Sequence, residues 1–339
     1  MNDHELFESE AFELPTELAG LTDARAAAED RFLDRANVVG VGLGHKIKAG
    51  EQSTTPSVMV LVTEKLPDQL LDSRDKVSKT VESTPTDVLE VGHLFAGGGS
   101  AGGDLASAPV EPLQAVDAQT LARRIRPVRP GYSVGHPKVT AGTIGAGCYD
   151  LRPLPGKPPK YYILSNNHVL ANSNDANLGD PIYQPGTFDG GGPADAIGRL
   201  ARYVPIKFDG TDNHVDAAIA EVPFDTIDRD IYWNGYPTTA AAAAAVGMLV
   251  KKTGRTTHFT TGRVTALNAT VNVGYGGGKV AKFVNQIITT DMSAGGDSGS
   301  LVLDWSNRPI GLLFAGSSVA TILNPIATVQ VSLGVRVWP

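Results

Sequence analysis

The chain of 339 residues has little of what several protein classes require, beginning with cysteine. Its single cysteine, Cys148, excludes an intramolecular disulfide framework and a metal site built from several cysteines, and we expect a buried apolar side chain there. The chain has 29 lysine and arginine residues and 36 aspartate and glutamate residues, so its net charge is negative. The excess of positive charge that favours nucleic-acid binding is absent. The sequence contains no run of about 18 apolar residues, so it predicts no membrane span.

The N-terminal segment also lacks the pattern of a leader. It is acidic, with no basic stretch followed by an apolar one, which is the arrangement typical of a signal peptide. We therefore expect a cytoplasmic protein without contact to a membrane, with secretion by another route as the alternative.

Glycine and proline, by contrast, are frequent, with 38 and 22 residues. Both break helices, which argues against a mostly helical protein. From residue 120 on, short apolar stretches rich in β-branched residues alternate with turn residues, and this predicts an all-β barrel or sandwich. The expected strands are Thr143–Tyr149, Tyr161–Ser165, Val215–Val222, Leu249–Lys252, Arg263–Val273, Val280–Thr290, Gly299–Leu303 and Pro309–Phe314. Six alanines at Ala240–Ala245 favour a helical turn.

The first part of the chain has a different pattern. Apolar residues at helical spacing predict a helix within Glu17–Arg35, and valine-rich stretches predict strands. We expect a small α+β domain over residues 1–95, a linker rich in glycine, alanine, serine and proline over residues 96–119, and a second domain over residues 120–339. The further elements expected in the first domain are strands at Asn37–Leu43, Ser57–Val62 and Thr86–His93 and a short helix at Lys65–Leu71.

Three segments of the second domain contain the groups that amide hydrolysis needs: a nucleophile, a base, a carboxylate to orient the base, and donors for an oxyanion. Ser298 lies in a glycine-rich turn, Gly-Gly-Asp-Ser-Gly-Ser, whose glycines permit consecutive N–H groups to point into one concavity. The N–H groups of Gly296 and Ser298 are the candidate oxyanion donors. His168 follows a predicted strand, and Asp216 begins another.

The segments SNNHVL, VDAAIA and GGDSGS, in the order His, Asp, Ser, resemble those of chymotrypsin-fold serine peptidases. The order differs from that of the α/β-hydrolases and the subtilisins. The resemblance covers roughly residues 131–335. It implies two packed six-stranded antiparallel β-barrels with a catalytic triad of His168, Asp216 and Ser298 at their junction. The first 115 residues or so have no counterpart in the simple digestive enzymes of the family.

The resemblance also implies a substrate pocket. Residues 252–257 and 261–264 are similar to the stretch that opens the second barrel in bacterial members, and residues 309–316 are similar to the strand that lines the primary pocket. Phe314 is expected to pair with substrate backbone, Ala315 and Gly316 to form one wall, and Asn324–Ile326 to close the opposite side. Met292 stands where trypsin-like enzymes carry an acid, which argues against arginine or lysine specificity and for an apolar or small residue.

The chain departs from the family at two points. No cysteine flanks His168, as fits a reducing compartment. In trypsin-like enzymes a newly cut N-terminus is inserted beside the acid that precedes the serine, here Asp297. No matching activation site is evident in this chain. Because bacterial members generally do without that switch, we expect the pocket to form constitutively.

Other residues give alternatives. Asp212 and Asp209 are fallback members of the triad. His214 is expected on the same side of a strand as Asp216. His45, His93, His136 and His258 show no metal-ligand spacing, so no metal is expected, although the loop Asp189–Asp195 is left open for a calcium contact.

Two glycine-rich patches, at residues 39–44 and 276–279, lack the context of a nucleotide site, and we interpret them as strand and hairpin glycines. The sequence thus predicts a serine endopeptidase that acts on a peptide or protein substrate without a cofactor. The alternative is a non-catalytic or autoinhibited peptidase-fold module that binds a peptide or protein partner. The first domain would then be the interaction unit or would occlude the cleft. The sequence does not determine the oligomeric state.

Overall fold

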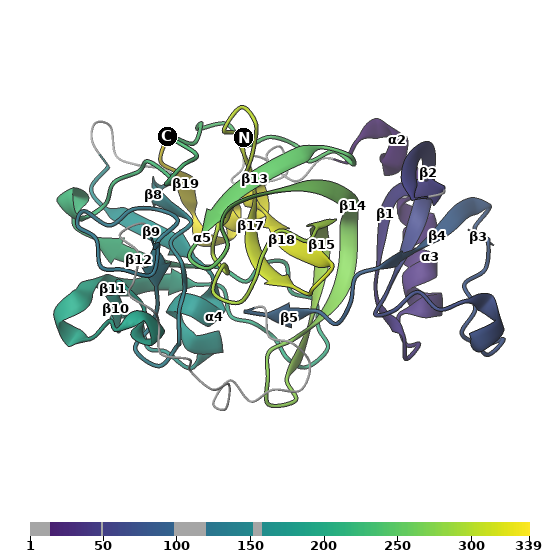
Figure 1. Cartoon of the computed structure of the whole chain (residues 1–339), viewed down its shortest axis with the longest axis horizontal. Coiled ribbons are helices and arrows are strands. Elements are labelled where there is room, and N and C mark those ends of the chain that lie inside the picture. Colours follow the sequence, from purple (N-terminus) through teal and green to yellow (C-terminus); the bar gives the residue numbers. More distant parts are fainter. Residues whose placement is uncertain (1–13, 49, 98–119, 152–157) are drawn as a thin grey trace, which may run out of the picture.

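A computed structural model describes residues 14–48, 50–97, 120–151 and 158–339 of the chain. Figure 1 shows three regions: a first sheet (teal), a barrel (green and yellow), and an N-terminal unit (purple and blue) on the far side of the barrel from the first sheet. None of the helices in the described residues is long and apolar enough to cross a membrane.

The second barrel is closed. Its strands follow the order β13-β16-β17-β18-β15-β14, and β13 also pairs with β14, which completes the ring. The strands are β13 (Leu249–Gly254), β14 (His258–Gly274), β15 (Val280–Thr290), β16 (Leu301–Asp304), β17 (Pro309–Gly316) and β18 (Ala320–Pro325).

The first barrel region is a six-stranded sheet in the order β10-β11-β12-β9-β8-β19, whose last strand comes from the C-terminal end of the chain. Its strands are β8 (Ala146–Asp150), β9 (Tyr161–Ser165), β10 (Pro181–Tyr183), β11 (Ala196–Tyr203), β12 (Ala218–Val222) and β19 (Val335–Val337). A short pair, β6 (Ser133–Val134) and β7 (Gly142–Thr143), and helices α4 (Asn167–Leu170) and α5 (Ile326–Leu333) complete the region. The all-β, double-barrel class predicted from the sequence is confirmed.

The N-terminal unit combines two helices with strands. Its elements are α2 (Thr16–Ala19), α3 (Thr22–Phe32), β1 (Val38–Lys48), β2 (Glu51–Val62), β3 (Thr80–Val81), β4 (Thr84–Glu90) and β5 (Phe95–Ala96). The helix expected within residues 17–35 is confirmed by α3, although it is preceded by a separate short helix: α2 ends at Ala19 and α3 begins at Thr22. Ala24, Ala28 and Phe32, spaced by four residues, form the buried face of α3.

β1 of the unit pairs directly with β14 of the barrel, so that one sheet runs through both. Alternating glycines permit this close approach. A Cβ atom at Gly40 would lie 2.5 Å from the Thr270 carbonyl oxygen, and one at Gly44 would lie 2.8 Å from that of Thr265. These glycines therefore serve strand packing, and those at residues 276–278 form the β14–β15 hairpin turn with positive φ.

The unit and the barrel also share buried side chains. Val41 and Val58 of the unit lie in the same apolar cluster as Val264 and Ile287 of the barrel. At the edge of the contact, the Glu29 carboxylate of α3 accepts hydrogen bonds from Thr270 and Lys282, each at 2.8 Å. Burial raises the pKa of Glu29, but these donors outweigh it and hold the pKa below its ordinary value.

The chain leaves the unit as an extended arm, residues 91–96, which lies against the barrel (Figure 1). Val91 and Leu94 are buried in a cluster with Phe314 and Ala315. β5, at the end of the arm, pairs with β17 on one side and β14 on the other. The predicted linker begins at residue 96, but Ala96 belongs to β5, and residues 98–119 lie outside the described residues.

Several smaller expectations differ from the structure. The helix expected at residues 65–71 is only a 3-10 turn at Asp68–Leu70. The helical turn expected for the alanines at 240–245 is absent, and the Ala242 N–H donates instead to the Pro309 carbonyl oxygen of β17. Strands β10, β11, β18 and β19 were not predicted.

Candidate active site

His168 and Asp216 meet at one end of the first sheet. β9 and β12 pair antiparallel, with Ser165 opposite Ala218 at one end of the pair. His168 follows Ser165 by three residues and Asp216 precedes Ala218 by two, so both lie at this end. His168 lies in the single turn of α4, and its Nδ1 lies 2.6 Å from Asp216 Oδ2. The backbone N–H of His168 also donates to Asp216 Oδ1, at 3.2 Å. Asp216 is fully buried.

Buried amides hold the backbone around Asp216. Asn166 Nδ2 donates to the Asp216 carbonyl oxygen at 2.7 Å, and the Asp216 N–H donates to Asn324 Oδ1 at 2.9 Å. Asn324 Nδ2 donates in turn to Gln286 Oε1 at 2.7 Å, and Gln286 Nε2 donates to the His214 carbonyl oxygen at 3.0 Å. The sequence reasoning did not assign Asn166 or Gln286 to the site, and it assigned Asn324 only to the pocket.

Tyr275 is a further neighbour that the sequence reasoning missed. Its hydroxyl donates to Asp216 Oδ2 at 2.7 Å, and its ring meets the His168 ring edge-on, with centroids 6.1 Å apart. Burial first, and then the carboxylate of Asp216, raise the pKa of Tyr275 well above its ordinary value, so the hydroxyl keeps its proton.

Ser298 lies in a tight turn between β15 and β16. Gly296 and Gly299 have φ of +96° and +94°, a conformation that favours glycine. Two hydrogen bonds to β17 hold the turn: the Gly299 N–H donates to the Leu313 carbonyl oxygen, and the Leu313 N–H donates to the Ser300 carbonyl oxygen. Within the described residues, the N–H groups of Gly296 and Ser298 donate no hydrogen bond, so both can serve as oxyanion donors.

Backbone contacts bring this turn to the end of β9. The Thr143 N–H donates to the Ser298 carbonyl oxygen at 2.8 Å, and the Ser165 hydroxyl donates to the Thr143 carbonyl oxygen at 2.8 Å. A Cβ atom at Gly299 would overlap the Ser165 hydroxyl. The Ser298 turn of the second barrel therefore packs on the strand of the first sheet that leads into His168.

His168 Nε2 is buried and has no hydrogen-bond partner in the described residues, and the Ser298 hydroxyl makes no hydrogen bond there either. The structure thus packs the Ser298 turn on the strand that leads into His168. Within the described residues it makes the His168–Asp216 contact and no hydrogen bond between Ser298 and His168. Such links in free enzymes often tighten only in the complex with substrate.

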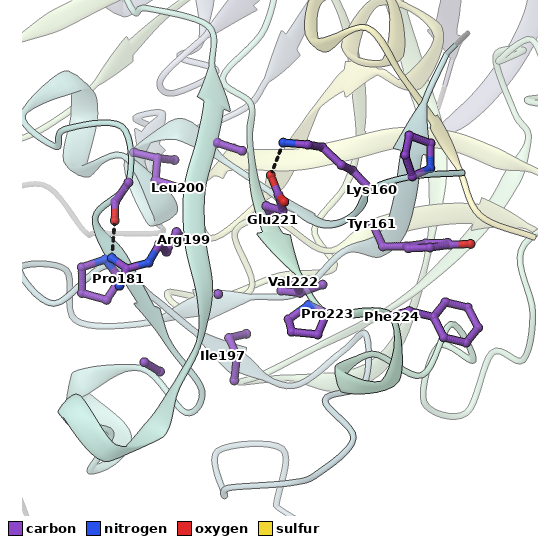
Figure 2. A pocket seen from close by; sticks show the side chains of 15 residues that line it. Lys160, Tyr161, Pro181, Ile197, Arg199, Leu200, Glu221, Val222, Pro223 and Phe224 are labelled. Atoms are coloured by element: carbon purple, nitrogen blue, oxygen red, sulfur yellow. Dashed lines mark hydrogen bonds and ion pairs between the residues drawn. The ribbon is translucent and has the colours of Figure 1, made fainter. Parts of the chain in front are cut away.

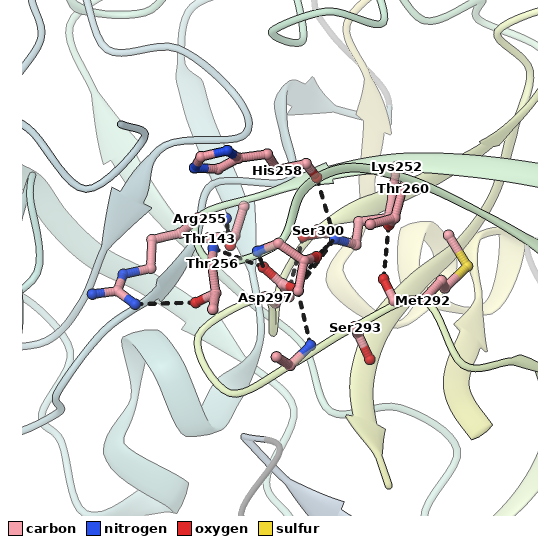
Figure 3. A network of polar contacts seen from close by, with 12 residues as sticks. Thr143, Lys252, Arg255, Thr256, His258, Thr260, Met292, Ser293, Asp297 and Ser300 are labelled. Carbon is pink, nitrogen blue, oxygen red and sulfur yellow. Dashed lines mark hydrogen bonds and ion pairs between the residues drawn. The ribbon is translucent and has the colours of Figure 1, made fainter. Parts of the chain in front are cut away.

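Asp297, next to Ser298, is the centre of a buried polar network (Figure 3). Its carboxylate accepts from Lys252 Nζ at 3.1 Å, from the Thr257 hydroxyl at 2.6 Å, and from the backbone N–H groups of Thr256, Thr257 and Ala294. Burial lowers the pKa of Lys252, and Asp297 only partly offsets this effect. The Lys252 side chain thus lies fully buried beside this acid.

The predicted pocket residues surround the same turn. Met292 is buried, with its N–H donating to Thr321 Oγ1 and its carbonyl oxygen accepting from Thr260 Oγ1. The Phe314 ring packs on Phe283, with centroids 4.7 Å apart, and the residue is fully buried. Ala315 and Gly316 pair with the arm, opposite Ala96 and Phe95 respectively.

The alternative residues lie elsewhere. His214 is exposed while Asp216 is buried, so the expectation that they share a side is wrong: residues 211–217 are not in a strand. Asp212 and Asp209 are exposed, and Asp212 pairs with Lys282.

In the loop left open for calcium, Asp189 pairs with Arg255 and Asp195 pairs with Arg124. The part of the chain that the structure describes contains no cluster of three His, Cys, Asp or Glu side chains that could hold a metal.

A hollow on the first sheet holds none of these residues. Figure 2 shows it lined by Lys160, Tyr161, Arg199, Glu221 and Phe224. It lies at the Tyr161–Val222 end of the β9–β12 pair, opposite the end that carries His168.

The closed barrel, the first sheet and the His–Asp pair at their junction define the chymotrypsin-like serine peptidase fold. No family model matches the chain. It is 40% identical over 106 residues to glutamyl endopeptidase 2 of Streptomyces griseus, and 38% identical over 116 residues to serine protease 1 of Streptomyces fradiae. These matches cover 30% and 32% of this chain, and only 53% and 30% of the relatives' own length.

Solved structures similar to the chain include two proteases. Thermobifida fusca protease A matches 62% of this chain and 98% of its own, with 18% identity and a TM-score of 0.44. A glutamic acid specific serine protease matches 62% of this chain and 100% of its own, with 23% identity and a TM-score of 0.44. The resemblance predicted from the three sequence segments is confirmed by the curated relatives.

Proposed function

We propose that the chain is a serine endopeptidase whose triad is His168, Asp216 and Ser298. The observation that carries the proposal is the 2.6 Å contact between His168 Nδ1 and buried Asp216. It leaves His168 Nε2 without a partner at the junction to which the Ser298 turn is packed. A proton on Nδ1, held by the carboxylate, makes Nε2 the basic nitrogen.

The mechanism follows from these roles. His168 Nε2 takes the hydroxyl proton as Ser298 Oγ bonds to the carbonyl carbon, and the Gly296 and Ser298 N–H groups stabilise the oxyanion. His168 then gives the proton to the leaving amine, the C–N bond breaks, and an acyl-enzyme forms. Water, deprotonated by His168, releases the acid and restores the serine.

The substrate class is a peptide or protein with an apolar or small residue before the cleaved bond. Thr260 and Thr321 bond to the Met292 backbone, and a Cβ atom at Gly316 would lie 3.2 Å from Ser293 Oγ; none of these three side chains carries a charge. A buried, uncharged pocket disfavours charged residues. The relatives give no support to the predicted cytoplasmic location, and we propose no location.

Active-site labelling tests the proposal. A fluorophosphonate probe is expected to modify the full-length protein once, on Ser298, as located by mass spectrometry, because the proposed base His168 and the free N–H groups of Gly296 and Ser298 would activate this hydroxyl. Casein-derived peptides should be cleaved by the same preparation. Labelling at another serine, or none at native pH, would refute the assignment.

One observation favours the autoinhibited alternative as a second candidate. The backbones of Gly299 and Ser300 form hydrogen bonds with Leu313 along one edge of β17. The other edge of β17 is paired with β18. Further along β17, Ala315 and Gly316 pair with the arm. A substrate bound as an added strand next to Ser298 needs this same edge, so the arm and the substrate compete for it.

Loosening the arm is therefore expected to raise peptide turnover. Ala96→Pro weakens the pairing with Ala315, and a loss of about 1–2 kcal/mol shifts the population by roughly 5–30-fold toward the open edge. Turnover of a peptide that spans several residues should rise accordingly, whereas the rate of labelling by a small fluorophosphonate, which needs no strand edge, should change little.

The matched control is Leu70→Ala, at an exposed position of the same unit. Equal peptide turnover in Ala96→Pro and in this control would dismiss occlusion by the arm.

A further inference from the structure

Tyr275 is placed beside the triad by the β14–β15 hairpin, not by either element that carries His168 or Asp216. It follows Gly274, the last residue of β14, and its N–H donates to the Lys279 carbonyl oxygen across the turn at 2.9 Å. Its hydroxyl donates to Asp216 Oδ2 at 2.7 Å, the same oxygen that lies 2.6 Å from His168 Nδ1.

The carboxylate of Asp216 needs this donor. A fully buried carboxylate is costly unless hydrogen bonds satisfy its oxygens. The described residues give it three donors, and two of them, the N–H and Nδ1, belong to His168 itself. Tyr275 is thus the only donor there that can hold the carboxylate independently of the imidazole that the carboxylate must orient.

The tyrosine ring is fixed by packing that does not involve its hydroxyl. It meets Phe208 edge-on, with centroids 5.4 Å apart, and stacks on Phe283 at 6.2 Å. The hydroxyl is therefore presented from a rigid position, and its removal leaves the ring supported.

We propose that Tyr275 is a positioning residue for the reaction, acting through Asp216. The proposal rests on the proposed triad. The hydroxyl fixes the direction of the Asp216 carboxylate, and with it the tautomer and the angle of the His168 ring. By sharing Oδ2, it also weakens the carboxylate's hold on the Nδ1 proton, because an oxygen with two donors is a weaker acceptor for each.

The test is Tyr275→Phe in the full-length protein, compared with Tyr162→Phe. Tyr162 is a matched control because its hydroxyl also donates to a carboxylate, that of Asp150 at 3.2 Å, away from the triad. We expect Tyr275→Phe to lower kcat roughly tenfold or more, the effect typical of losing a hydrogen bond to a charged group, with KM unchanged. The rate of fluorophosphonate labelling should fall in parallel, and the thermal unfolding midpoint should match that of the control.

A second readout does not depend on turnover. The low-field proton resonance of the His168 Nδ1–H should move further downfield in Tyr275→Phe, because Oδ2 then serves one strong donor instead of two, and it should stay in place in Tyr162→Phe. A kcat and a resonance equal to those of the control would overturn the proposal.

Failure of the triad itself gives a different pattern. Wild-type protein that is neither labelled on Ser298 nor active on peptides contradicts the proposed function. The resonance of His168 then still reports whether Tyr275 positions Asp216. Tyr275→Leu, which also removes the ring, separates the two parts of the side chain: a loss no larger than that of Tyr275→Phe assigns the whole effect to the hydroxyl.

Discussion

Replacing Ser298 by alanine is expected to lower kcat by about 10⁶-fold and to abolish fluorophosphonate labelling, the largest effect of any single change in the chain. The variant loses the atom that forms the acyl-enzyme in the proposed mechanism, while Gly296 and residue 298 keep their N–H groups. Catalysis of roughly 10³–10⁴-fold over water should therefore persist from oxyanion stabilisation and binding. Stopped assays on a chromogenic peptide, at high protein concentration, measure both levels.

The fold should survive this substitution, because the Ser298 hydroxyl makes no hydrogen bond within the described residues and only its backbone anchors the turn. Ser306→Ala, in the exposed turn between β16 and β17, is the matched control and should retain full activity. If both variants unfold at the same midpoint as the wild type, the loss of activity in Ser298→Ala comes from the missing nucleophile and not from loss of the fold. Residual turnover of Ser298→Ala within tenfold of wild type would show that another nucleophile carries the reaction.

The sequence predicted the parts of the site that lie in local patterns. His168, Asp216 and Ser298 each stand in a short segment with recognisable neighbours, and the strands around them show alternation or dense β-branched residues. The structure brings these segments to one junction. Whether Ser298 and His168 form a hydrogen bond depends on their side-chain rotamers. The spacing of the segments in the sequence therefore could not predict that this bond is absent within the described residues.

The supporting residues could not be found in the same way. Tyr275 lies 59 residues from Asp216, and Asn324 lies 108 residues from it, so their contacts are set by the closure of the second barrel. A single tyrosine or asparagine in a polar stretch has no periodic signal. The one available hint was the run of glycines after Tyr275, which marks a hairpin tip that can project a side chain.

The N-terminal unit illustrates a different limit. Strands β1, β2 and β4 were predicted, but their continuation into the barrel sheet was not, although Gly40, Gly42 and Gly44 lie on one face at strand spacing. Such alternation is a sign of close packing between backbones. The arm gave no signal at all, since β5 has only two residues and its partners on β17 come more than 200 positions later.

The second large effect is a loss of stability, expected on breaking the buried Lys252–Asp297 pair next to Ser298. In the described residues the Asp297 carboxylate accepts five hydrogen bonds, and only one of them comes from Lys252. Asp297→Leu leaves the Lys252 ammonium and the amides without their acceptor, and should cost about 3–5 kcal/mol of unfolding free energy. Lys252→Met removes one donor and leaves the carboxylate with four, so its cost should be smaller, about 1–3 kcal/mol.

Urea unfolding of the full-length protein measures this asymmetry, provided that the slope m stays constant across the variants. Arg308→Met is the matched control, since Arg308 is half exposed in its pair with Asp304 and should change stability by no more than about 1 kcal/mol. Asp297→Leu should also slow labelling of Ser298, because Asp297 fixes the turn that aims the Gly296 and Ser298 N–H groups. A larger cost for Lys252→Met than for Asp297→Leu would mean that the ammonium, and not the carboxylate, organises this turn.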